Sequence, residues 1–554
     1  MNRRDLAVLA ALAASSAVYL LYLPHALPVL DDWTWLEALH KARTGGFAVE
    51  IAFFQHIIDN TWLGQFRIFW TGLLPYFVFA LAAGFSGWPY FLLAWAAHLL
   101  TGLLLFRIVS LLSGDGEIAF TAAAVYVVFP AANGALFWPL TVYYLETLAF
   151  AAWFYYTWSK LAVRGDYRYR FTDFALLLAA VFSGEQILPA LLLLLPLTFW
   201  LAGERRQRRP FARFWLIHAG AMAVLLASYT LAINRESILQ SFGKRYETVH
   251  PWSLRGPSYM LFSSLGLNQD FARRLPGWWR DPALLALAAL AALAFFGTLR
   301  RRPASRSGAR FPELLLWSIA GVILTYLPTA RLNTFEWRYF YALSFFLVPA
   351  GVAVLAALPR PARLFASFVT LAWCLTQTYF ALTQCWIPQS REARAILDAV
   401  AAAGPFQSHE AFVFSGDHLV NGFAPSFING SSWSMQAALE RATGADHVRG
   451  ARDLVINEHG ELALHCRDEF LWFHRQDLAR LRVFVRRPDN RFVAKSILAL
   501  PAPDGRFEVV PLRSYSGLPL PSSPLTLDEL KRLAQFPDVY FARRISSHYK
   551  PTDL

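Results

Sequence analysis

The sequence is poor in charged residues, and this absence is its first informative property. Only 16% of its 554 residues are charged, whereas 56% are hydrophobic. A soluble globular protein carries about 25% charged residues. The composition therefore argues against a soluble protein, and the long apolar runs predict an integral membrane protein.

Cysteine is also scarce, with three residues in the whole chain. Cys374 lies inside an apolar run, while Cys385 and Cys466 could pair in an oxidising compartment, which the sequence leaves open. No Cys/His spacing is typical of a zinc site, and no segment repeats with a period of 20–50 residues. We therefore predict no metal site, no required cofactor and no repeat array.

The net charge is +13, but the basic residues form short clusters between apolar runs. Such clusters set membrane topology, so we expect no nucleic-acid partner. The first apolar run, 6–23, follows Arg3 and Arg4 and reads as a retained signal anchor. Ten more runs follow, which predicts a multi-pass α-helical membrane protein with about 11 transmembrane helices: 89–112, 118–130, 140–163, 172–183, 187–202, 214–233, 281–299, 312–328, 339–358 and 362–384.

Eleven crossings put every basic cluster between the runs on one side, the same side as the N-terminus. This pattern predicts a multi-pass membrane protein with a cytoplasmic N-terminus. The loop 234–280 weakens the pattern, because it carries seven Lys and Arg residues on the outer side. The run 172–202 reads as two short helices with an outer turn, although one long helix is an alternative.

Two domains are expected. Residues 1–387 form the membrane domain, whose first outer loop, 24–88, contains a short apolar run, 71–85, read as a surface helix. Hydropathy falls from residue 388, so 388–554 is predicted to be a periplasmic soluble α/β domain. It has a helical pattern at 391–403 and strand patterns at 411–415, 492–500 and 507–512.

The acidic pair Asp31 and Asp32 directly follows the first predicted span. Carboxylates at a membrane interface are costly, and a carboxylate beside a like charge is a good candidate for a general base. The competing interpretation is that Asp32 caps the helix beginning at Trp33.

A late outer loop, 328–339, carries Arg331, Arg338 and Tyr339 against the charge trend of the outer side. Because arginine binds phosphate bidentately, these residues are candidate phosphate ligands. An interfacial anchor, or an ion pair with Glu336, is the alternative.

Four further residues could assist the acidic pair and the phosphate ligands at the predicted site. Glu185 sits between two apolar runs, and His98 lies within one, where a packing role is the usual explanation. His56 and Asp59 lie in the first outer loop. A metal site built from His56, Asp59 and the acidic pair is an alternative that their spacing does not require.

In this order, these features resemble the GT-C superfamily of membrane glycosyltransferases over roughly residues 1–390. The acidic pair matches the family's acidic motif, and Arg338-Tyr339 matches its late Arg-Tyr motif. Further segments also resemble it: 66–107 with His98, Phe129-Pro130 with Trp138, and Ser183-Gly184-Glu185 with Pro189. The set is most similar to bacterial relatives of protein O-mannosyltransferases and of the lipid A aminoarabinose transferase.

Two positions depart from the family pattern. Phe129 replaces the family's histidine before Pro130, and Gly184 replaces its lysine before Glu185. The resemblance implies a polyprenyl-phosphate sugar donor, Asp31 or Asp32 as general base, and inversion at the anomeric carbon. Arg331 and Arg338, together with Arg67, would then stabilise the departing phosphate.

The implied acceptor is a lipid, glycan or protein, and membrane lipids surround the enzyme. The sequence leaves three other functions open. An O-antigen-ligase-like transferase would use the loop 234–280, a transporter or flippase would need inverted repeats, and a scaffold would only display the C-terminal domain.

Overall fold

The computed structural model describes residues 3–29, 31–58, 70–164, 311–329, 337–416, 432–466, 469–513, 520–533 and 539–545, with short stretches between 175 and 224. These residues divide into two compact units. The first unit comprises residues 1–26 and 51–383, and the second comprises 27–50 and 384–554. The second unit therefore includes part of the segment read as the first outer loop.

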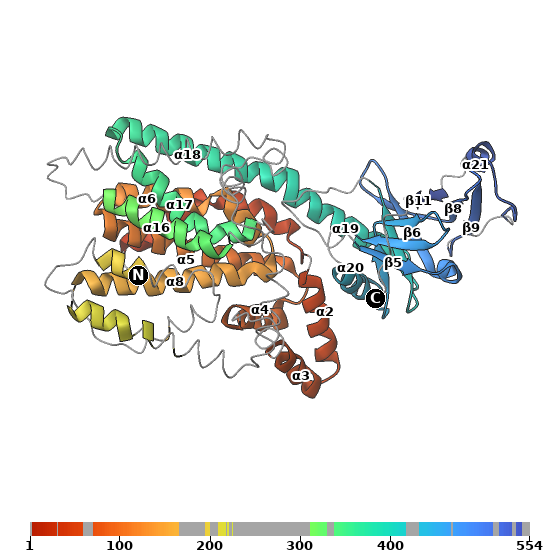
Figure 1. The fold of residues 1–554 in the computed structure, drawn as a ribbon, viewed down its shortest axis with the longest axis horizontal. Coiled ribbons are helices and arrows are strands. Elements are labelled where there is room, and N and C mark those ends of the chain that lie inside the picture. Colours follow the sequence, from red (N-terminus) through yellow and green to blue (C-terminus); the bar gives the residue numbers. More distant parts are fainter. Residues whose placement is uncertain are drawn as a thin grey trace. The chain divides into compact units, whose positions relative to one another are not determined.

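The first unit is helical. Its described helices, drawn in Figure 1, are α1 (Arg3–Ser15), η1 (Ala17–His25), α4 (Trp70–Ala83), α5 (Gly87–Ser113), α6 (Gly116–Val127), η3 (Pro130–Ala132), α7 (Asn133–Leu136), η4 (Pro139–Thr141), α8 (Val142–Arg164), α16 (Phe311–Thr329), α17 (Trp337–Leu355) and α18 (Arg360–Ala381). The helix α3 (Phe47–Ile58) begins in the second unit and ends in the first.

The helix α5 is the centre of the first unit and packs against α1, α6 and α8. It ends where Gly114 adopts a left-handed conformation with φ 71°, and Asp115 then caps α6 by accepting the N–H groups of Glu117 and Ile118. A Cβ atom on Gly102 would lie 2.5 Å from Val127, so glycine permits the close approach of α5 and α6.

The prediction of about 11 transmembrane helices is wrong for the part of the chain that the structure describes. By length and composition, two helical segments there could cross a membrane, Gly87–Ser113 and Arg360–Ala402. The number rises to four if each of two bent helix pairs counts as one span. The predicted runs between 172 and 299 fall mostly outside the described residues.

The shortfall has local causes. The first apolar run breaks at Ser16, where α1 and η1 meet at 56°, and the run 118–130 breaks before Pro130 at 45°. The runs near 312 and 339 contain shorter apolar helices, Pro312–Thr325 and Tyr341–Leu355. The run 140–163 forms α8, but its many Tyr and Trp residues make it less apolar than an aliphatic helix.

The second unit combines helices with three small sheets. Its helices are α2 (Asp31–Thr44), α19 (Ile387–Ala402), α20 (Ser432–Thr443), η8 (Arg475–Arg480) and α21 (Leu527–Leu533), and the π-helical turn η6 (Leu382–Trp386) lies at the unit boundary. The strands are β1 (Ala411–Ser415), β2 (Arg449–Ala451), β3 (Asp453–Ile456), β4 (Leu462–Cys466), β5 (Glu469–Phe473), β6 (Leu481–Arg486), β7 (Phe492–Lys495), β8 (Ile497–Pro501), β9 (Phe507–Pro511), β10 (Val539–Phe541) and β11 (Arg543–Arg544).

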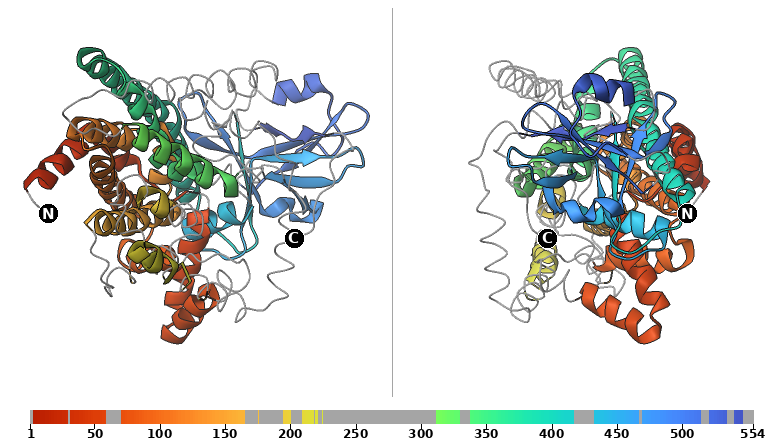
Figure 2. Two further views of the ribbon diagram at one scale, coloured as in Figure 1. Left: turned by 60° about the vertical axis from the view of Figure 1, so that its left-hand side comes forward. Right: turned by 90° about the vertical axis from the view of Figure 1, so that its right-hand side faces the viewer.

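The sheets have the strand orders β2-β1-β6-β7, β10-β8-β9 and β11-β3-β4-β5. The strand β1 runs parallel to β2 and β6, whereas β3, β4 and β5 form an antiparallel meander. Figure 2 shows the blue strands of this unit gathered together in two further views.

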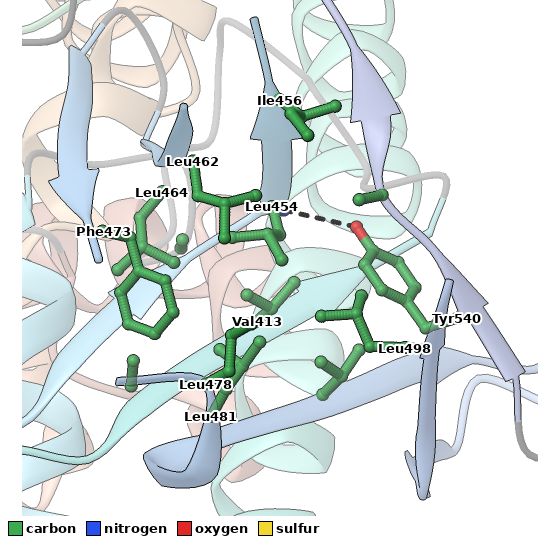
Figure 3. Packing of buried hydrophobic residues seen from close by; sticks show 14 of the residues in the cluster. Val413, Leu454, Ile456, Leu462, Leu464, Phe473, Leu478, Leu481, Leu498 and Tyr540 are labelled. Atoms are coloured by element: carbon green, nitrogen blue, oxygen red, sulfur yellow. Dashed lines mark hydrogen bonds between the residues drawn. The ribbon is translucent and has the colours of Figure 1, made fainter. Parts of the chain in front are cut away.

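A single apolar core joins strands from all three sheets, including Val413, Leu454 and Leu498 (Figure 3). Tyr540 lies in this core, and its hydroxyl oxygen accepts the N–H of Leu454 at 3.3 Å. The burial of these side chains stabilises the unit, because each large apolar side chain contributes about 1.5–3 kcal/mol.

Candidate functional site

The acidic pair begins α2. Asp32 is fully buried, and its Oδ2 accepts the N–H of Val29 at 2.7 Å. The indole N–H of the next residue, Trp33, donates to the carbonyl of Pro28 at 2.9 Å. These two bonds close the turn between the first apolar helices and α2.

This geometry differs from the helix cap considered above. An N-cap side chain accepts N–H groups further along its helix, whereas Asp32 reaches back to Val29, before α2 begins, as the third helical residue of a capping box does. The carboxylate therefore fixes the entry of the chain into α2. Asp31, the first residue of α2, is placed by its backbone.

The other end of α2 is attached to α20 of the same unit. The ammonium group of Lys41 lies 2.5 Å from Glu440 Oε2, 3.3 Å from Asp446 Oδ1 and 4.0 Å from Glu37 Oε1. The second oxygen of Glu440, Oε1, accepts from Gln436 and from the backbone of His447. Burial lowers the pKa of Lys41, but the hydrogen bonds and charges of Glu440 and Asp446 outweigh it, so the pKa is raised.

The contact between α2 and α20 also affects the pKa values of two more groups on α2, Glu37 and His40. Burial raises the pKa of Glu37, and the charges of Lys41 and Arg441 only partly oppose it. His40 Nε2 lies 3.0 Å from Arg441 Nη1. Because a guanidinium group only donates, His40 accepts here in its neutral form, and burial followed by the charge of Arg441 lowers its pKa.

His98 is a structural connection rather than an exposed reactive group. It is fully buried in α5, with Nε2 3.0 Å from the carbonyl of Val127 and Nδ1 2.8 Å from the hydroxyl of Tyr341. A carbonyl only accepts, so Nε2 carries the proton and Nδ1 accepts from Tyr341. His98 therefore joins α5 to the end of α6 and to α17.

Two predicted phosphate ligands lie on α17. Arg338 and Tyr339 are in its first turn, three and two residues before Tyr341. Helix N-termini favour anions because unpaired N–H groups and the helix dipole point there. His56 lies on α3 and, like Asp31, Arg338 and Tyr339, is placed by its backbone.

The remaining predicted site residues, Asp59, Arg67, Glu185 and Arg331, lie outside the described residues. Of the predicted site residues, Asp32 and His98 are those whose side chains the structure describes. They belong to different units, the second and the first respectively.

No group of three or more potential metal ligands occurs among the described residues. All three cysteines are buried and none forms a disulfide bond, so the alternative of a bridge between Cys385 and Cys466 is not realised. The thiol of Cys466 instead donates to the carbonyl of Gly450 at 3.0 Å.

Two buried polar residues of the first unit were not among the predicted site residues. Asn133 and Glu146 are 2% and 8% exposed, and each has side-chain atoms without a hydrogen-bond partner in the described structure. A carboxylate within an apolar run was the signal for Glu146, because ionisable groups there are costly. Nothing in the sequence marks Asn133 in the same way.

Neither a scan against protein-family models nor a search of curated proteins finds a match to this chain.

Proposed function

We propose that this protein is an inverting membrane glycosyltransferase, which moves a sugar from a polyprenyl-phosphate donor to an acceptor hydroxyl. The observation that carries the proposal is the acidic pair at the start of α2. Asp32 is buried and held by the N–H of Val29, directly after the apolar helices α1 and η1. Two aspartates adjacent in sequence, one of them held in place, suit base catalysis, because a positioned carboxylate takes the proton of an attacking hydroxyl.

The two aspartates take different roles. Asp32 holds the turn, and Asp31 is the general base. Asp31 accepts the proton of the acceptor hydroxyl as that oxygen attacks the anomeric carbon. The bond from this carbon to the phosphate oxygen breaks, and polyprenyl phosphate leaves with the electron pair, so the configuration inverts.

Arg331, Arg338 and Tyr339, together with Arg67, bind the phosphate of the donor. The position of Arg338 and Tyr339 in the first turn of α17 supports this assignment, since that turn favours an anion. Cationic side chains then stabilise the charge that grows on the phosphate in the transition state. No metal or other cofactor is needed for this step.

A lipid environment is supported by α18. Its exposed large apolar side chains include Phe365 and Phe368, which are 70% and 68% exposed. Such a face is unfavourable in water and suits acyl chains. We place the enzyme in the bacterial inner membrane, with a cytoplasmic N-terminus and the 388–554 region periplasmic, acting on a lipid, glycan or protein acceptor.

The test is sugar transfer by the purified full-length chain. Radiolabelled polyprenyl-phosphate glucose, mannose and aminoarabinose are incubated with the protein and bacterial envelope extract. We expect one donor to be consumed, with transfer reduced at least about 100-fold by Asp31→Asn. Arg338→Gln should raise the KM for the donor.

Asp528→Asn is the matched control, because Asp528 is an exposed acid on α21. Its transfer rate should equal that of the unmodified protein. Transfer that persists at the full rate in Asp31→Asn would reject the base assignment. Transport of intact lipid-linked sugar without transfer would instead identify a flippase.

A further inference from the structure

A broken segment crosses the interior of the first unit between α6 and α8. Residues 129–141 form three short helical pieces, η3, α7 and η4, and two of them begin with a proline, at Pro130 and Pro139. Nearly all of this segment is buried. Irregular backbone inside an apolar helical unit is tolerated where it is enclosed by protein or lines a polar cavity.

The segment is held in place by its own contacts. The hydroxyl of Thr141 lies 2.9 Å from the carbonyl of Ala135 and 2.6 Å from that of Trp138. The α7 piece packs on α5, α8 and α17. The position of Asn133, the first residue of α7, is therefore set by three surrounding helices.

Asn133 and Glu146 are the unexplained groups here. Asn133 is 2% exposed, and both its Oδ1 and its Nδ2 lack a hydrogen-bond partner in the described structure. Glu146, in the second turn of α8, is 8% exposed, and its Oε2 likewise has no partner there. Buried polar atoms are almost always bonded, so the side chains of Asn133 and Glu146, on two packed elements, have hydrogen-bonding atoms to offer a ligand.

The short helix that begins at Asn133 ends at an aromatic cluster. Phe137, at the end of α7, stacks on Phe91 with 6.0 Å between ring centroids and meets Tyr19 and Tyr22 at 5.7 and 4.7 Å. Trp138, the next residue, is 5% exposed. Aromatic faces beside amide and carboxylate groups are the combination that binds both the apolar face and the hydroxyls of a sugar ring.

We propose that Asn133 and Glu146 bind the hydroxyl groups of the sugar carried by the donor. This inference rests on the proposed glycosyltransferase function and adds a sugar-recognition site to it. One sugar hydroxyl donates to Glu146 Oε2, a second donates to Asn133 Oδ1, and a hydroxyl oxygen accepts from Asn133 Nδ2, so each unpaired atom gains a partner.

Other ligand classes fit less well. A phosphate group only accepts hydrogen bonds, so it would leave the acceptor oxygens Asn133 Oδ1 and Glu146 Oε2 without a donor. A divalent cation needs six or more oxygen ligands or a cluster of strong ones, and the described residues contain no such group. A neutral ligand with many hydroxyls matches both the charge and the donor–acceptor pattern.

The experiment compares the binding of lipid-linked sugar with that of the bare lipid phosphate. Full-length protein in detergent is titrated with polyprenyl-phosphate glucose, mannose and aminoarabinose, and with polyprenyl phosphate, by native mass spectrometry. We expect at least one sugar-bearing lipid to bind about tenfold tighter than polyprenyl phosphate. Asn133→Leu and Glu146→Gln should each remove this preference while leaving the affinity for polyprenyl phosphate unchanged.

Ser159→Ala is the matched control, since Ser159 is also buried on α8. It should keep the preference for the sugar. Loss of the preference in the control, or its retention in both Asn133→Leu and Glu146→Gln, overturns the inference, as does equal binding of all the lipids by the unmodified protein.

Transfer assays on the same samples separate this inference from the function on which it rests. A sugar preference that depends on Asn133 and Glu146, found in a protein that transfers no sugar, retains the site and rejects the transferase. Transfer with unchanged kcat and donor KM in both variants rejects the site alone. A thermal melt of each variant establishes that it folds.

Discussion

Lys41 and Glu440 lie 399 positions apart in the chain, yet the ammonium group of Lys41 is 2.5 Å from Glu440 Oε2. Asp446 and Glu37 complete the cluster around Lys41. The pair joins α2, which carries the acidic pair, to α20 within the second unit. A helix that the sequence assigned to the membrane domain is therefore part of the unit that contains the sheets.

Reversing either charge of this pair should destabilise the second unit. Glu440 is 8% exposed, so Lys41→Glu leaves a buried carboxylate facing a like charge, and we expect a loss of about 1–3 kcal/mol. The exchange Lys41→Glu with Glu440→Lys should recover about half of that loss. Thermal unfolding of the full-length protein in detergent measures both effects.

The exposed pair Lys531–Asp528, at 3.8 Å on α21, provides the reference for this measurement. Lys531→Glu should change stability by less than about 0.5 kcal/mol. If Lys41→Glu and Lys531→Glu change the stability by the same amount, the ion pair between α2 and α20 stabilises the unit no more than an exposed pair does.

Glu37 should make the free energy of unfolding of the second unit fall as pH rises. Its pKa is raised in the folded protein by burial. A raised pKa stabilises the fold below the ordinary value near 4.5, and this contribution is lost as pH rises through the folded pKa. Glu37→Gln removes the titration, so the variant should gain stability relative to the unmodified protein between pH 4 and pH 7.

Unfolding by denaturant at several pH values tests this expectation. Glu50→Gln is the control, because Glu50 lies at the edge of the same unit on α3. If the free energies of unfolding of Glu37→Gln and of the unmodified protein differ by the same amount at every pH, the titration of Glu37 is not the cause of the difference.

Tyr540 should make the core of the second unit sensitive to alkali. Burial raises the pKa of its hydroxyl to about 12. The stability that this group contributes is complete below its ordinary value of 10 and is lost as pH rises toward 12. Tyr540→Phe lacks this loss, and at neutral pH it should cost about 1 kcal/mol, because Leu454 N–H loses its acceptor.

The free energy of unfolding of Tyr540→Phe and of the unmodified protein, followed from pH 8 to pH 11, provides the comparison. The amount by which Tyr540→Phe is less stable than the unmodified protein should decrease as pH rises. A deficit that grows over this range would mean that ionisation of Tyr540 favours the folded state.

Several local features were predictable from the sequence because short-range rules decide them. The strand pattern at 411–415 matches β1, and the pattern at 507–512 matches β9, since alternation and flanking turns specify both. The pattern at 492–500 predicts one strand, and this is wrong, because Ser496 separates β7 from β8, which belong to different sheets. Nothing in the local pattern fixes such a change of partner.

The contacts that organise the candidate site were not predictable in this way. The attachment of α2 to α20 depends on long-range ion pairs, and charge patterns along the chain do not reveal partners 399 residues apart. The count of membrane-spanning helices failed for another reason. Hydropathy averages over breaks such as those at Ser16 and Pro130, where the backbone changes direction.

His98 should be essential for folding rather than for chemistry. Its ring joins Val127 and Tyr341 in a fully buried position, so His98→Phe leaves a buried hydroxyl and a buried carbonyl without their partner. We expect a loss of about 2–4 kcal/mol, and about half of it for Tyr341→Phe, which breaks one of the two bonds. Melting temperatures of the detergent-solubilised variants measure this.

The kcat of the folded fraction distinguishes a structural role from a catalytic one. For His98→Phe it should remain within about threefold of the unmodified rate, whereas a catalytic histidine contributes at least about 100-fold. A well-folded but inactive His98→Phe protein would restore His98 to the list of reacting groups.

Sugar transfer should depend on the pair Lys41–Glu440 as well as on the acidic pair, because both are carried by α2. Asp31 and Asp32 occupy its first turn, Asp32 fixes one end of the helix to Val29, and Lys41 fixes the other end to α20. Displacement of a catalytic base by about 1 Å is enough to lower a rate about 100-fold. Lys41→Glu should therefore lower kcat about 10- to 100-fold with little change in donor KM. Combining it with Glu440→Lys, which restores the ion pair with its charges exchanged, should recover most of this loss of kcat.

Since Asp31→Asn removes the base itself, adding Lys41→Glu to that variant should cause little further loss of kcat. If the two losses instead multiply, the ion pair acts on transfer by a route other than the position of Asp31.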